Sequence, residues 1–115
     1  MANTSVIRLV GQTYALSVSN SSHASVTITD TTNDQVNFAS FLNPSSVAVA
    51  VKFSSAATCP AAVFPVDGTP GDFVLPPLME SPIVLAVPTT PFSMTAIGAS
   101  AGPSVIYVTP AADQS

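Results

Sequence analysis

Proline is the residue type that most constrains how this chain can fold. The chain has 115 residues and eleven prolines, which all lie between Pro44 and Pro110. Each proline removes a backbone donor and fixes φ, so it interrupts helices and tends to end strands. The spacing therefore excludes long helices from the C-terminal two thirds of the chain and favours short strands joined by turns.

Polar and apolar residues alternate along much of the chain. In residues 46–55, one face of an extended strand would carry Val47, Val49, Val51 and Phe53, and the other Ala48, Ala50, Lys52 and Ser54. This period of two predicts a strand with one buried face. The opposite face is small and nearly uncharged, which suits packing against a neighbouring molecule.

Eight further tracts have strand character, and each is bounded by Gly, Pro, Asn or Asp: 6–10, 13–20, 25–30, 35–42, 72–75, 82–87, 92–97 and 104–109. The first two alternating tracts, 13–20 and 25–30, predict a hairpin with a polar turn between them. Short strands at intervals of about 8–12 residues are typical of sandwiches. We therefore expect an all-β, single-domain β-sandwich or jelly roll of about eight short strands over residues 1–115, with 1–5 and 110–115 as flexible ends.

Two connections need separate interpretation. Residues 56–72 are rich in turn signals such as Asp67-Gly68 and predict a long ordered loop with a short strand at 62–64. An apolar cluster around Phe64 in this loop would cap the sandwich or anchor a subunit contact. Residues 98–102 have the spacing G-x-S-x-G, but they join two predicted strands, so we expect a flexible hairpin loop rather than a nucleophile elbow.

Charge is unusually scarce, and this bears on partners. Only 7% of the residues are charged, with two basic and six acidic side chains, against about 25% in an ordinary soluble domain. Such a surface predicts a subunit of an assembly. Two basic residues cannot neutralise several phosphates, so no nucleic acid is expected as a partner. The apolar runs are about five residues long, far short of the roughly 18 that cross a bilayer, so no membrane segment is expected.

The sequence contains few candidate catalytic or metal-binding residues. The single histidine, His23, lies in a Ser-rich turn, where we interpret it as a solvated residue rather than a catalytic base. The lone Cys59 excludes an intrachain disulfide and is interpreted as a small buried thiol. Asp30 with Asp34, and Asp67 with Asp72, flank turns and are interpreted as turn caps rather than calcium ligands. We therefore expect no catalytic residue, no metal and no cofactor.

Three tracts carry a resemblance to a known class of proteins: residues 64–77 (FPVDGTPGDFVLPP), 91–98 (PFSMTAIG) and 102–108 (GPSVIYV). They resemble small virion proteins of tailed bacteriophages, in particular the capsid-decorating or cement proteins that coat the head. The likeness covers about the last half of the chain and consists of short strands separated by Pro and Gly, with little charge. It includes no catalytic or ligand motif. It implies a jelly-roll or similar β-fold, self-association into dimers or trimers, and binding to the major capsid protein.

The leading hypothesis is a non-enzymatic virion structural protein that decorates and stabilises the phage head. It would be made in the host cytoplasm, since the N-terminus lacks the basic and apolar regions of an export signal. The candidate assembly contacts are Ala48, Ala50, Phe64, Pro65, Pro76 and Pro77. Two alternatives stay open: a receptor-binding or carbohydrate-binding module of a tail or fibre that uses polar loops 20–23 and 31–34, and a hydrolase that uses His23.

Overall fold

Nine strands run through the residues that the computed structural model describes, which are 7–31, 36–101 and 104–113. They are β1 (Ile7–Leu9), β2 (Tyr14–Val18), β3 (Val26–Ile28), β4 (Phe38–Leu42), β5 (Val49–Ser54), β6 (Phe73–Leu75), β7 (Ile83–Ala86), β8 (Phe92–Gly98) and β9 (Ser104–Asp113). Each overlaps a predicted tract, because alternating β-branched and aromatic residues suit a pleated, half-buried surface. The prediction of an all-β single domain is confirmed.

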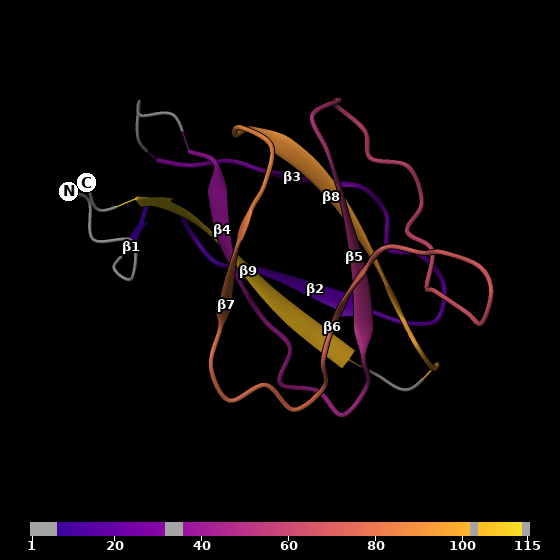
Figure 1. Cartoon of the computed structure of the whole chain (residues 1–115). Helices are drawn as coiled ribbons and strands as arrows, with labels where there is room; N and C mark the ends of the chain where they lie inside the picture. Colours follow the sequence, from indigo (N-terminus) through magenta and orange to yellow (C-terminus); the bar gives the residue numbers. More distant parts are fainter. Residues whose placement is uncertain (1–6, 32–35, 102–103, 114–115) are drawn as a thin grey trace.

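The strands form two antiparallel sheets that pack face to face as a β-sandwich (Figure 1). The five-stranded sheet has the order β1-β9-β4-β7, with β2 also paired to β9, and the four-stranded sheet has the order β3-β8-β5-β6. Strands β1 and β2 pair with different parts of β9: Leu9 lies opposite Ala111, and Val18 lies opposite Ser104. The last strand of the chain is therefore central to its sheet.

The pairing pattern identifies the sandwich as a jelly roll. Strand β5 pairs with β6, β4 with β7, β3 with β8 and β2 with β9, so the pairs are nested one inside the next. Such a chain is one long antiparallel ribbon rolled up so that successive strand pairs alternate between the two sheets. The further pairs β4 with β9 and β5 with β8 join the rolled ribbon into those sheets.

The core lies between the sheets and is filled by the alternate apolar side chains of both. Its largest fully buried members are Phe41, Phe92, Leu16, Ile28, Leu75, Met94 and Ile106. Three aromatic rings connect the two layers. The Phe53 ring of β5 lies 5.3 Å from the Phe41 ring of β4 and 6.0 Å from the Phe92 ring of β8, measured between centroids. Tilted and edge-on pairs of this kind add to the stabilisation from burial alone.

Two predicted hairpins are wrong. Strands β2 and β3 do not pair with each other, because β2 pairs with β9 and β3 with β8 in the opposite sheet. Residues 99–101 likewise follow β8 of one sheet and lead toward β9 of the other, so they do not close a hairpin. Rolling the ribbon places β2 and β3, and likewise β8 and β9, in different sheets, and local alternation carries no information on this.

Three smaller expectations concern the loop and the ends. Residues 110–113 are not a flexible end, since β9 continues to Asp113 and pairs there with β1. No strand forms at 62–64; the loop has instead an isolated bridge between Val66 and Thr69 around Gly68, whose φ is +78°. Residues 1–5 and 114–115 lie outside the described residues. Within the described part of the chain, no helix has the length and hydropathy that a membrane crossing requires.

Candidate functional site

The outer face of the four-stranded sheet is covered by the chain's own long loop, residues 55–72. In Figure 1 this loop lies on the right-hand side, next to β5 and β8. Thr95 of β8 donates a hydrogen bond to the Pro60 carbonyl at 2.8 Å, and Ser93 donates one to the Ala56 carbonyl at 2.8 Å. Cys59 of the loop is buried against the sheet, with its sulfur 3.6 Å from the Thr95 hydroxyl. This face is therefore occupied within one copy of the chain.

Polar contacts hold the loop at both ends. The Cys59 N–H donates to the Ser25 hydroxyl at 2.9 Å, and the Ala62 N–H donates to the Ser22 hydroxyl at 2.9 Å. At the far end, Asp72 accepts a hydrogen bond from the Val63 N–H at 2.7 Å and lies 3.5 Å from the Lys52 ammonium. The polar turn that was predicted for a hairpin thus supports the loop instead.

Two segments of the loop touch at Gly71, and this contact gives a first prediction. A Cβ on Gly71 would lie 2.6 Å from the Val63 carbonyl oxygen and 2.7 Å from the Pro65 Cα. Backbone atoms cannot yield as a flexible side chain does, so we expect Gly71→Ala to lower the free energy of unfolding by about 1–3 kcal/mol. Urea unfolding measures the change, with the exposed loop substitution Ala57→Ser as control. A Gly71→Ala midpoint equal to that of wild type would refute the close approach.

The structure places the predicted assembly contacts in different environments. Ala50 has no exposed surface, so the expectation that it lies on a solvent-exposed face is wrong. It lies between Val74 and Ile97 at its two register positions, and these larger side chains share its face of the sheet. Ala48 is half-buried, and its carbonyl accepts a hydrogen bond from the Ala99 N–H at 2.9 Å.

The other four candidates belong to two separate loops. Phe64 and Pro65 are half-buried in the long loop, whereas Pro76 and Pro77 are exposed between β6 and β7. The structure therefore does not gather the candidates into one surface. Their role in assembly remains a prediction.

The buried Asn43 holds the loop that carries Pro76 and Pro77. Its side-chain amide donates to the carbonyls of Val47 at 2.9 Å and Pro76 at 3.2 Å, and its Oδ1 accepts from the Ser45 hydroxyl at 2.6 Å. Its backbone carbonyl accepts from the Met79 N–H at 3.0 Å. One side chain thus ties the connection after β4 to the connection after β6.

The five-stranded sheet has an outer face of a different kind, which we call the open face. It consists of the side chains that alternate with the core residues: Ala15, Ser17, Phe38, Ser40, Leu42, Val84, Ala86, Val105 and Tyr107. None of these residues is charged. Val84 and Tyr107 are each 39% exposed, and Ala15, Ser17 and Ala86 are also exposed. The open face is therefore an uncharged, largely apolar surface in contact with solvent.

A shallow pocket borders the open face where β2 ends and β9 begins. Its volume is about 350 Å³, and it is lined by Ser17, Val18, Pro44, Ser45, Ser104 and Val105. Two of its three hydroxyl groups serve the fold, because Ser104 donates to the Val18 carbonyl at 3.0 Å and Ser45 to Asn43. The open face is therefore bordered by a concave site at this end.

The residues considered for chemistry lie in separate parts of the described chain. The Nδ1 of His23 lies 2.7 Å from the neighbouring Ala24 carbonyl oxygen. Among the described residues, no three His, Cys, Asp or Glu side chains come together as a metal site. Asp72 contacts Lys52 and a backbone N–H of the loop, and Asp34 lies outside the described residues.

Comparisons of the chain with protein-family models, with curated proteins and with solved structures gave no match. Fold and surface chemistry therefore carry the functional argument. The open face escaped sequence reasoning because alternation separates the two faces of a strand without showing which of them a distant loop covers. A scarcity of charge in β4, β7 and β9 was the one available signal.

Proposed function

We propose that this protein is a non-enzymatic structural protein of a tailed-phage virion, a head decoration protein that binds and stabilises the shell of major capsid protein. The observation that carries the proposal is the open face, an uncharged sheet surface with exposed Tyr107 and Val84. The jelly roll supports it as an architecture that viral capsid domains use, although the same fold also serves lectins and enzymes.

The physical case rests on what the open face lacks and what it offers. Burial of apolar surface contributes about 25 cal/mol of favourable free energy for each Å² removed from water. Binding through this face requires no charge of this chain to be desolvated. Tyrosine is also enriched at protein interfaces, where its ring packs against apolar groups and its hydroxyl forms a hydrogen bond. A repetitive capsid lattice would then retain many copies through many modest contacts.

A substitution on the open face tests the proposal. We expect Tyr107→Arg to bind phage heads at least about tenfold more weakly than wild type, because it places an unpaired charge at the centre of the contact. Binding is measured by co-sedimentation with heads of a phage from which the gene for this chain has been deleted. Thr27→Arg, at an exposed position of β3 in the other sheet, is the control and should bind as wild type does. Failure of the wild-type chain to sediment with heads would overturn the proposal.

The pocket beside the open face favours a second candidate function. Its volume of about 350 Å³ lies within the range of small-ligand sites, and its three serines are uncharged hydrogen-bonding groups. This arrangement fits a receptor-binding or carbohydrate-binding module of a tail or fibre. Gold-labelled antibody against the chain separates the two candidates, since it would mark heads in the first case and tails or fibres in the second.

A further inference from the structure

The edge strand β7 leaves backbone groups unpaired in a defined pattern. Within the described residues, β7 pairs only with β4. The Val87 N–H donates to the Asn37 carbonyl at 2.8 Å, so these two residues form a hydrogen-bonded pair of the ladder. Hydrogen-bonded and non-hydrogen-bonded pairs alternate in an antiparallel ladder. The N–H and C=O groups of Val84 and Ala86 therefore point away from β4, toward the free edge.

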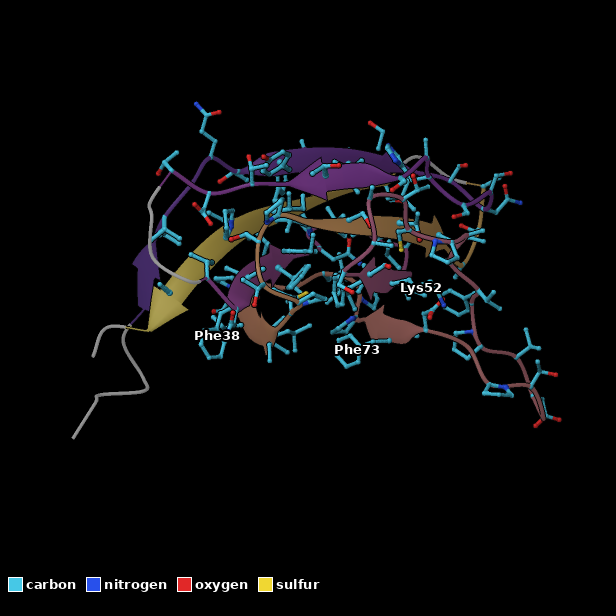
Figure 2. All side chains as sticks on the ribbon, turned by 90° about the horizontal axis from the view of Figure 1, so that it is seen from above. Phe38, Lys52 and Phe73 are labelled. Atoms are coloured by element: carbon cyan, nitrogen blue, oxygen red, sulfur yellow. The ribbon has the colours of Figure 1, made fainter. Side chains whose placement is uncertain are left out.

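This edge lacks the charged side chains that often prevent strands from adding to a sheet. Its sequence, Ile83-Val84-Leu85-Ala86, contains no charge, and Val84 and Ala86 are exposed. Two other edges differ: β6 follows Asp72, which pairs with Lys52, and the sequence of β1 contains Arg8. The edge strands β2 and β3 are uncharged, as β7 is. Charged side chains on an edge disfavour pairing with another molecule, and β7 has none. Figure 2 shows the edge strands β6 and β7 on one side of the molecule, where the Phe38 and Phe73 side chains point outward.

Prolines limit the length of the exposed edge. By the same alternation, Pro82 and Pro88 occupy the outward-facing positions next to Val84 and Ala86. Neither proline has an N–H to donate. Only two residues of this edge can therefore offer a complete donor and acceptor, which is too few for open-ended addition of strands and enough for one short, defined contact.

We propose that two copies of the chain pair antiparallel through β7, about a twofold axis at Leu85. In this register Val84 lies opposite Ala86 of the second copy, and the two equivalent pairs exchange about four hydrogen bonds. Pro82 lies opposite Pro88 of the second copy, so the residues without donors face one another. The inference rests on the proposed function only in naming the copy-to-copy contact of an assembly subunit.

A second copy is the occupant that the edge fits best, because the contact is complementary to itself. A twofold contact brings the same segment from both copies together, and here that segment has no charge to repel its own copy. Antiparallel pairing also places Glu80 of one copy opposite Thr90 of the other, so the two Glu80 carboxylates stay apart. The Thr90 hydroxyl donates a hydrogen bond to Asp30, which is the acidic residue nearest to that position. The pairing would make the two five-stranded sheets continuous and set two open faces side by side, which doubles the contacts with a lattice.

Solution mass tests the dimer and its surface. We expect purified wild-type chain to have twice its monomer mass of 11.6 kDa in size-exclusion chromatography with light scattering. Val84→Pro removes an outward donor that β4 does not use, and we expect it to run as a monomer. Tyr107→Arg changes the open face but not the edge, so it should remain a dimer. A wild-type monomer or trimer, a dimeric Val84→Pro, or a monomeric Tyr107→Arg would overturn the proposal.

Cross-linking decides the case even if Val84→Pro fails to fold, and it tests the register. Hydrogen-bonded antiparallel partners have Cα atoms about 5.5 Å apart, within the range of a disulfide. We expect the double variant Val84→Cys/Ala86→Cys to form a covalent dimer on mild oxidation, whereas the single variant Val84→Cys and the parent chain with its buried Cys59 should stay monomeric on a non-reducing gel. Absence of the covalent dimer would overturn the pairing, and an efficient Val84→Cys dimer would overturn the register.

The outcomes for this contact and for the proposed function are separable. A dimer that does not bind heads would contradict the decoration function and leave the β7 contact standing. A monomer that binds heads through Tyr107 would contradict the β7 contact and leave the decoration function standing.

Discussion

The Phe41→Ala variant is expected to lose about 3–5 kcal/mol of unfolding free energy, the usual cost of truncating a buried aromatic side chain. Phe41 is fully buried in β4, and its ring is tilted by 46° against the Phe53 ring at 5.3 Å. Phe53 in turn contacts Phe92, so the truncation opens a cavity at the point where aromatic rings join the two sheets. A domain of this size has a total stability of about 5–15 kcal/mol, so the loss is large. Urea unfolding followed by circular dichroism measures it.

Phe73→Ala is the matched control for this substitution. Phe73 lies in the edge strand β6, and its side chain is 49% exposed. It has less contact to lose and leaves no enclosed cavity, so we expect a loss below about 1 kcal/mol. Equal losses for the two phenylalanines would show that the core is not centred on Phe41.

Asn43 is the site of the second large expected effect. We expect Asn43→Ala to lower the free energy of unfolding by about 2–4 kcal/mol, because each buried polar group left without a partner costs about 1–3 kcal/mol. The substitution removes the donors to the carbonyls of Val47 and Pro76 and the acceptor for the Ser45 hydroxyl. Thermal and urea unfolding both report the change.

An isosteric variant separates lost hydrogen bonds from lost volume. Asn43→Asp keeps the shape of the side chain but replaces the amide donor with an oxygen that faces the carbonyls of Val47 and Pro76. We expect it to be at least as destabilising as Asn43→Ala at neutral pH, and the exposed control Asn20→Asp to have little effect. Wild-type stability in Asn43→Asp would show that the amide does not hold the two loops together.

Strand positions were predictable here because their cause is local. The tracts around Val49–Ser54 and Phe92–Gly98 alternate strongly enough that burial of one face fixes them as strands. Strand partners were not predictable, because the pairs β2 with β9 and β3 with β8 join residues far apart in the sequence. A polar turn after a strand is compatible with a hairpin and equally with a crossing to the other sheet.

Pro110 shows how a local rule misplaced the end of a strand. Proline is rare inside central strands because it lacks an N–H, so the expected strand ended at residue 109. In the structure Pro110 lies within β9 where the strand changes partner, from β2 at Tyr14 to β1 at Leu9. The Pro110 carbonyl accepts a hydrogen bond from the Val10 N–H at 3.1 Å, so the residue still contributes to the sheet.

The candidate surface was only partly accessible to sequence reasoning. Scarce charge predicted an assembly subunit, and that remains a proposal. The choice of Ala50 failed because Val74 and Ile97 lie beside it on the same face of the sheet, and strand pairing between distant parts of the sequence places them there. Such contacts follow from the tertiary fold, which alternation does not encode.

The central place of β9 has a consequence for how the protein is made. This strand pairs with β1, β2 and β4, so none of these three can complete its pairing until β9 leaves the ribosome. The five-stranded sheet therefore cannot form stepwise from the N-terminus, and β1, β2 and β4 lack this partner until β9 has been made. Cells that produce this chain in quantity must keep these strands from associating with other molecules until β9 emerges, and a premature stop before β9 would release a product without the central strand of the five-stranded sheet.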